Sequence, residues 1–221
     1  PLSASLVKDL EFAVSKLSLQ DSRRDAVIGK SQCIGATRSS QKSFVKSMTL
    51  EEQNLIYLLA SSEEIRAAAK GIQWTGVQVN CGVSKWHQDT GNVGLSMILA
   101  LGKFTGGEFL QGTQSYDISG SALVFGGSKA HAFNPFGGIR YSLVLFEHSG
   151  APDLTAHDRV YLELMGVPWR LSPMQVKMPP PIAKCPGFLQ TWTYQVLYLY
   201  AGAERKSSIK QSVSARIYRS Q

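Results

Sequence analysis

The first third of the chain alternates between helical and irregular patterns of apolar positions. Residues 4–18 repeat apolar side chains at helical spacing, which predicts an amphipathic helix. Residues 19–48 have few apolar positions and are rich in Ser, Lys, Arg, Gln and Gly, so we expect a loop there. Capping-box patterns at Thr49 and Ser61 predict two short helices that pack on a sheet, and Gly71 ends the second.

From residue 72 the pattern changes to short β-rich runs separated by Gly, Asn and Ser. Closely spaced short strands without intervening helices predict a double-sheet jelly roll, a cupin-like and mainly β architecture with helical additions. After Gly150 prolines limit regular structure, although Leu154–Leu164 fits a helix and Trp192–Tyr200 a strand or short helix. The predicted strands are Gln73–Asn80, Leu95–Leu101, Gly107–Gln111, Ala122–Phe125, His131–Phe133 and Ile139–Glu147.

The composition fits one globular domain. With 221 residues, of which 43% are hydrophobic, the chain can bury one sizeable core. We therefore divide a single domain into helical N-terminal support (residues 1–71), a jelly-roll core (72–148) and a C-terminal extension (149–221). Apolar runs fall well short of the roughly 20 residues that span a bilayer, and no secretory signal is visible, so we expect no contact with a membrane. We also expect a monomer.

Cysteine usage and charge indicate the cellular compartment and the kind of partner. Three widely spaced cysteines without CxxC pairs argue against a disulfide framework or a zinc site and favour a reducing, intracellular compartment. The net charge of +7 lies in the flanks: residues 1–48 and 204–221 each carry +4, whereas 49–203 carry −1. Basic flanks can contact a phosphate backbone, but solvated, disordered ends give the same pattern and are the commoner case.

Three side chains have the composition of a redox metal site. His87 and Asp89 lie two residues apart, so on a strand or extended loop both project to one side. His131 is the best placed of the other three histidines to add a third ligand. Two His and one carboxylate are the ligands of non-haem Fe(II) oxygenases, which leave positions open for a co-substrate and O₂. A histidine such as His87, taken alone, is more often structural. The metal site is predicted from His87 in combination with the other motifs.

A carboxylate-binding pair follows His131. Arg140 and Ser142 alternate along the apolar run Ile139–Phe146, which places both on one face of a strand. A planar guanidinium beside a hydroxyl suits a carboxylate, because the guanidinium can form two parallel hydrogen bonds to it.

These motifs, in this order, resemble the Fe(II)/2-oxoglutarate-dependent dioxygenases. The H-x-D motif at His87, the distal His131 and the R-x-S motif at Arg140 carry the resemblance, and Phe104–Glu108 (FTGGE) resembles a segment between the two metal motifs. The resemblance covers roughly residues 72–148 and implies the fold expected above. It implies Fe(II), 2-oxoglutarate and O₂ as cofactors, with oxidative decarboxylation to succinate and CO₂.

Finer details are most similar to the TET/JBP branch, which hydroxylates the methyl group of 5-methylpyrimidines in nucleic acid. They are Asn80, the spacing His87-x-Asp89-x-x-Asn92, and the GGIRYS sequence at 137–142. Nucleic acid, most simply DNA, is then the partner, and a nuclear location would follow. The branch does not separate 5-methylcytosine from thymine, or DNA from RNA.

The resemblance also implies roles for the residues around the motifs. Arg140 would bind the far carboxylate of 2-oxoglutarate, with Ser142 and Asn80 beside it. Asn92 would contact the target pyrimidine, although a loop-capping role is equally compatible with its position. Three aromatic residues would form apolar walls against which a flipped base stacks: Trp86, Phe133 and Phe136. Ordinary packing within the barrel is equally compatible with their positions.

Two other functions stay open from the sequence. The core motif permits a protein side chain or a small molecule as substrate equally well. A jelly-roll binding module with a degenerate metal site is the non-catalytic alternative, which the complete ligand set and the carboxylate anchor argue against.

Overall fold

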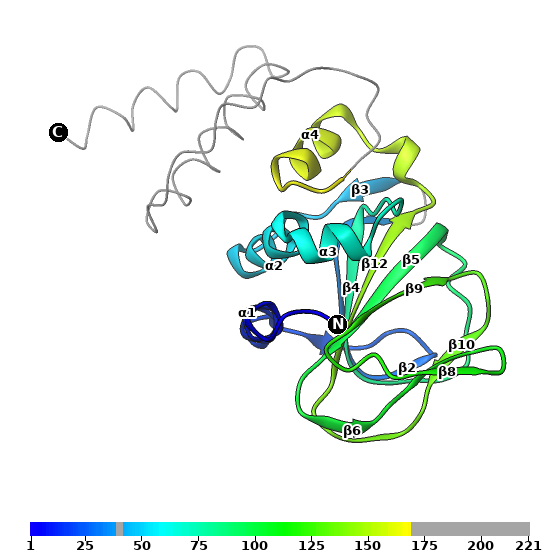
Figure 1. Ribbon diagram of the computed structural model, residues 1–221. Helices are drawn as coiled ribbons and strands as arrows, with labels where there is room; N and C mark the ends of the chain where they lie inside the picture. Colours follow the sequence, from blue (N-terminus) through cyan, green and yellow to red (C-terminus); the bar gives the residue numbers. More distant parts are fainter. Residues whose placement is uncertain (39–41, 169–221) are drawn as a thin grey trace, which may run out of the picture. The chain divides into compact units, whose positions relative to one another are not determined.

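A seven-stranded antiparallel sheet forms the central layer of the molecule (Figure 1). The computed structural model describes residues 1–38 and 42–168. The strand order is β1-β2-β4-β12-β5-β9, with β3 paired to β2. The strands are β1 (Gln20–Asp21), β2 (Val27–Arg38), β3 (Ser43–Val45), β4 (Gly76–Ser84), β5 (Asn92–Leu101), β9 (Ala122–Gly126) and β12 (Tyr141–His148).

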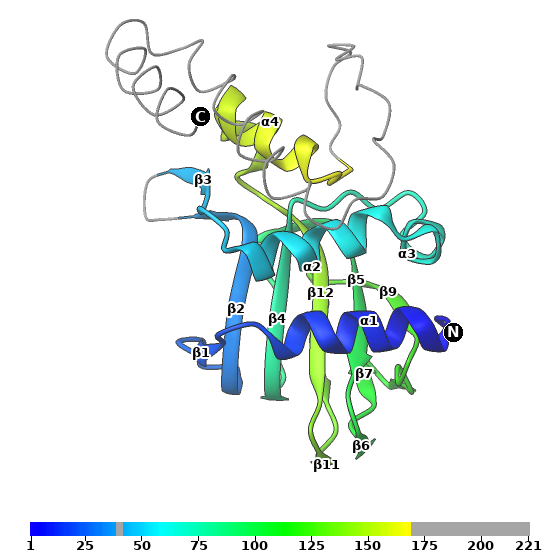
Figure 2. The same cartoon turned by 90° about the vertical axis from the view of Figure 1, so that its left-hand side faces the viewer.

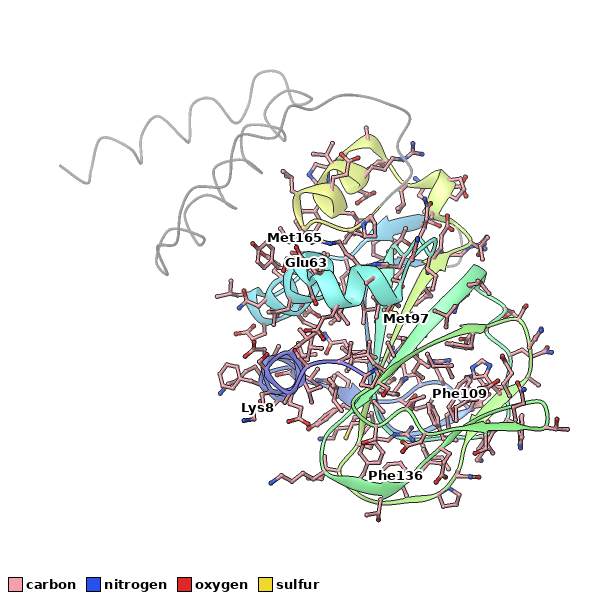
Figure 3. The ribbon with its side chains drawn as sticks, in the orientation of Figure 1. Lys8, Glu63, Met97, Phe109, Phe136 and Met165 are labelled. Atoms are coloured by element: carbon pink, nitrogen blue, oxygen red, sulfur yellow. The ribbon has the colours of Figure 1, made fainter. Side chains whose placement is uncertain are left out.

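Shorter strands cover one face of this sheet. One group, in the order β10-β7-β8, contains β10 (His131–Phe133), β7 (Phe109–Gln111) and β8 (Gln114–Tyr116), and the other pairs β6 (Phe104–Gly106) with β11 (Phe136–Gly138). A buried cluster joins the layers: Ile98 and Val144 of the large sheet meet Phe109 and Phe133 of the small one. Figure 3 shows Phe109 between the layers. The predicted jelly roll is therefore confirmed.

Helices within the first 68 residues cover the other face of the large sheet (Figure 2). Side chains alternate along each strand, so the buried Val79, Met97 and Leu143 point away from the jelly-roll interior toward the helices. The helices are α1 (Ala4–Ser15), α2 (Leu50–Ser61), α3 (Glu63–Ala68) and α4 (Ala156–Leu164), the last preceded by the short 3₁₀ helix η1 (Ala151–Asp153). None of the described helices is long and apolar enough to span a membrane.

The helix starts follow their capping residues. Thr49 and Glu52 form the predicted capping box at the start of α2, each side chain accepting a hydrogen bond from the other's backbone N–H. For the second helix the capping residue is Ser62 rather than Ser61, because Ser61 still belongs to α2. Leu50, at the first position of α2, is 44% exposed.

The predicted loop over residues 19–48 is wrong. Instead β2 pairs with β4 from Val27↔Ser84 to Gly35↔Gly76 and belongs to the large sheet. The sequence of β2 has little apolar alternation, so the strand leaves no local pattern. Its backbone hydrogen bonds are made with a strand some 50 residues away. Residues 1–71 are consequently not helical support alone. The element predicted at Trp192–Tyr200, the basic segment 204–221 and most of the C-terminal extension lie outside the described residues.

Candidate active site

Backbone pairing brings the three predicted metal ligands together at one end of the jelly-roll interior. After β4 the chain crosses to the small sheet, where His87 and His131 exchange backbone hydrogen bonds of 3.0 and 2.9 Å. The Asp89 N–H donates to the Gly127 carbonyl, 2.8 Å away, on the loop between β9 and β10. The positions of the two histidines and the aspartate are thus fixed by main-chain contacts rather than by the side chains themselves.

The ligand atoms converge on one point. The His87 Nε2 lies 3.6 Å from Asp89 Oδ1, and the His131 Nε2 lies 3.7 Å from Asp89 Oδ2. All three ligand atoms lie within 4.8 Å of one another, which is the arrangement required to hold a single metal ion. The convergence predicted from the H-x-D motif and His131 is confirmed. Neither His148 nor His157 joins this group.

Hydrogen bonds set both imidazoles in the metal-binding tautomer. The Nδ1 of His87 lies 2.7 Å from the Lys85 carbonyl, and the Nδ1 of His131 lies 2.8 Å from the Lys129 carbonyl. A carbonyl only accepts, so each Nδ1 carries the proton and each Nε2 offers its lone pair toward the shared point. Burial also lowers the pKa of His131, which favours its neutral form.

Two further side chains hold the Asp89 carboxylate. The Asn92 amide donates to Oδ2 over 3.2 Å, and the Arg24 guanidinium donates to Oδ1 over 3.3 Å. Asn92 was predicted to contact a pyrimidine; that role stays a prediction, and the structure adds the contact with Asp89. Arg24 was not predicted at all, because it lies 65 residues from Asp89 in a segment expected to be a loop.

Arg140 is buried beside this site, just before β12. Its side chain is 1% exposed and its guanidinium carbon lies 3.7 Å from the centre of the Phe133 ring and 4.6 Å from that of Phe136. Nη1 donates to the Gly107 carbonyl over 2.8 Å, whereas Nε and Nη2 have no partner among the described residues. Those two nitrogens form one edge of the guanidinium, the edge that binds a carboxylate side-on.

The burial of Arg140 indicates whether the site suits an anionic ligand. Burial lowers the pKa of Arg140 to about 10, which leaves the group charged near neutral pH. No carboxylate of the described residues pairs with it, and a buried charge is normally paired. A carboxylate on a bound co-substrate would supply the missing partner. Phe133 and Phe136 contact Arg140, and their predicted role as walls for a flipped base stays a prediction.

Ser142 and Asn80 lie opposite each other on β12 and β4 and face the same interior. Both are buried, and the Asn80 amide donates to the Ser142 hydroxyl over 3.4 Å. The Asn80 Oδ1 has no partner among the described residues, so this pair keeps polar capacity for a ligand. Trp86, next to His87, is 55% exposed, and its predicted role as a wall for a flipped base stays a prediction.

A separate hollow of about 720 Å³ lies near the start of β5, lined by Val93, Leu95, Glu147 and Arg159 among others. It contains none of the three ligands and not Arg140, so the chemistry described above is not located there.

Comparisons with known proteins bear on the fold of the chain. No protein-family model and no curated protein sequence matches the chain. Among solved structures it is similar to an oxidoreductase of the 2OG-Fe(II) oxygenase family from Burkholderia pseudomallei, with 18% identity, 65% of this chain and 78% of that chain covered, and a TM-score of 0.51. The fold is that of the 2OG-Fe(II) oxygenases. At this identity the likeness concerns the fold, and it confirms the fold expected from the sequence.

Two more solved structures are similar at lower scores. NgTET1 in complex with 5mC DNA shares 18% identity, with 74% of this chain and 77% of that chain covered and a TM-score of 0.49. A Pseudomonas putida prolyl-4-hydroxylase shares 19% identity, with 67% and 89% covered and a TM-score of 0.46.

Proposed function

We propose that the chain is an Fe(II)- and 2-oxoglutarate-dependent dioxygenase that oxidises the methyl group of a 5-methylpyrimidine, 5-methylcytosine or thymine, in nucleic acid. Two features of the site together support the enzymatic activity in this proposal. The Nε2 atoms of His87 and His131 meet the Asp89 carboxylate within 4.8 Å, and the buried Arg140 nearby has a free edge for a carboxylate.

Each residue would have a distinct task. His87, Asp89 and His131 would hold the iron, which together with 2-oxoglutarate and O₂ supplies the oxidising chemistry when bound. Arg140 would bind the far carboxylate of 2-oxoglutarate through Nε and Nη2, and its contacts with Gly107 and the phenylalanine rings keep that edge pointed at the ligand. Ser142 and Asn80 would add hydrogen bonds beside it. Burial of this region limits the access of water.

The nucleic-acid part rests on the TET/JBP-like details and on the charge around the site. Three segments meet there: 22–30, 84–90 and 126–131, joined by the Lys85 N–H to the Ala26 carbonyl and by the Asp89 contact with Gly127. Together they carry five Lys or Arg against two Asp, one of which is the candidate metal ligand. A basic rim with the exposed Trp86 suits a phosphate backbone and a base removed from its stack.

Incubation with defined substrates tests the proposal. The protein is given Fe(II), 2-oxoglutarate and air with 5-methylcytosine DNA, unmethylated thymine-containing DNA or a peptide pool, and succinate and nucleosides are quantified by mass spectrometry. We expect succinate to rise with DNA and an oxidised methyl group to appear in equal amount. If succinate rises with the peptides alone, the substrate is a protein side chain instead of a nucleic acid. Failure to bind Fe(II) would favour the non-catalytic module.

A further inference from the structure

The β1–β2 turn supplies a cation to the metal site. Arg24 lies in this turn, and its Nη2 is 3.3 Å from Asp89 Oδ1. The Arg24 side chain is 36% exposed, whereas the Asp89 side chain is 13% exposed, so the contact forms where the site opens to the surface. We propose that Arg24 is a positioning residue that holds the Asp89 carboxylate and, through its charge, favours ferrous over ferric iron. This inference rests on the proposed function.

The turn that carries Arg24 is held by several backbone contacts. The Arg24 N–H donates to the Ser22 hydroxyl, its carbonyl accepts from the Val27 N–H, and the Ser22 N–H donates to the Gly29 carbonyl. The Ala26 carbonyl accepts from the Lys85 N–H, two residues before His87. The turn is therefore tied to the segment that provides two metal ligands, and the position of Arg24 is set by the sheet.

The two carboxylate oxygens of Asp89 have unequal partners. Oδ2 accepts from the neutral Asn92 amide, whereas Oδ1 accepts from a cation. Both contacts restrict the carboxylate, and partners of this kind orient the ligands of metal sites. Of these two residues, Arg24 is the one that also adds a positive charge close to the metal position. A nearby positive charge disfavours the more highly charged ferric ion, so the site should favour Fe(II), the form that the proposed reaction requires.

The first test compares reduction potentials of the iron-loaded protein. Wild type, Arg24→Ala, Arg24→Lys and Arg23→Ala are titrated anaerobically in a spectroelectrochemical cell, in which each ferrous ion gives one electron to the electrode. The ferric fraction is followed by electron paramagnetic resonance. We expect a lower potential for Arg24→Ala, a potential near wild type for Arg24→Lys, and no change for Arg23→Ala, an exposed neighbour of the same charge. An unchanged or raised potential in Arg24→Ala, or equal values for its Ala and Lys variants, would overturn the tuning role.

The second test needs no metal. Unfolding by denaturant is measured for wild type, Arg24→Ala, Asp89→Asn and the double variant. If Arg24 holds Asp89, Arg24→Ala destabilises the wild type but has little effect when residue 89 is Asn. Equal effects in both backgrounds would overturn the positioning role. If the wild type bound no iron, the proposed function and the tuning role would fail, while this cycle would still decide whether Arg24 holds Asp89.

Discussion

Replacing Arg140 by Met should greatly weaken the binding of 2-oxoglutarate while changing the stability of the fold little. Arg140→Met removes a buried charge whose pKa is lowered to about 10, a drop that corresponds to roughly 3 kcal/mol of desolvation. Against this gain stand the contact of the guanidinium with Phe133, worth about 1–2 kcal/mol, and the hydrogen bond to the Gly107 carbonyl, worth about 1.5–3 kcal/mol. The two sides nearly cancel. We expect the free energy of unfolding of the ligand-free variant to stay within about 2 kcal/mol of wild type.

The loss of 2-oxoglutarate affinity should be far larger. The variant gives up two charge-assisted hydrogen bonds, from Nε and Nη2, each worth about 1.5–3 kcal/mol. At about 1.4 kcal/mol per tenfold change, the dissociation constant should rise on the order of 10²- to 10⁴-fold. Calorimetric titration of 2-oxoglutarate into protein loaded with Zn(II), which does not turn over, measures this directly.

Pyruvate provides the internal control, because it has the keto acid of 2-oxoglutarate but not the far carboxylate. Its affinity should be weak and nearly equal in wild type and Arg140→Met. Ser142→Ala, which removes one neutral hydroxyl, should weaken 2-oxoglutarate by about tenfold or less. A folded Arg140→Met protein that binds 2-oxoglutarate as wild type does would refute the role of Arg140 as the carboxylate anchor.

Three further predictions concern the site and its surroundings. His87→Ala should abolish Fe(II) binding and succinate formation, whereas His157→Ala, an exposed histidine outside the group, should preserve both, as measured by metal analysis and succinate release. Gly107→Ala should raise the KM for 2-oxoglutarate by roughly tenfold and destabilise the fold by about 1 kcal/mol or more, because Gly107 has φ +77° and a Cβ would lie 2.9 Å from Arg140 Nη1. Gly112→Ala, at φ +60° in open space, should lose stability alone, and an equal rise in KM in both variants would contradict the contact. Because burial lowers the pKa of His131, the unfolded chain takes up its proton at a higher pH than the folded chain, so the metal-free protein should lose stability as pH falls through about 6.5, and denaturant titrations of wild type and His131→Gln should differ in this slope.

The metal ligands could be predicted from the sequence because their signal is local. The spacing of His87 and Asp89 fixes their common side on any extended backbone, and His131 needs only to follow on a neighbouring strand. Arg140 and Ser142 also follow from alternation, although the strand itself begins at Tyr141.

The remaining parts of the site depend on tertiary pairing that leaves no local pattern. Arg24 reaches Asp89 only because β2 pairs with β4, and the polar sequence of β2 hides that pairing. Phe136 has an ordinary position in sequence, yet it contacts Arg140 because β11 folds back on β6. Its aromatic ring alone could not distinguish packing on a cation from packing on a base.

An anaerobic crystal structure with Fe(II) and 2-oxoglutarate, with iron located by its anomalous scattering, tests the central claim most directly. We predict one iron site bound by His87 Nε2, Asp89 and His131 Nε2, with the far carboxylate of 2-oxoglutarate on Nε and Nη2 of Arg140. Iron bound elsewhere, or a co-substrate carboxylate that does not contact Arg140, would contradict the account.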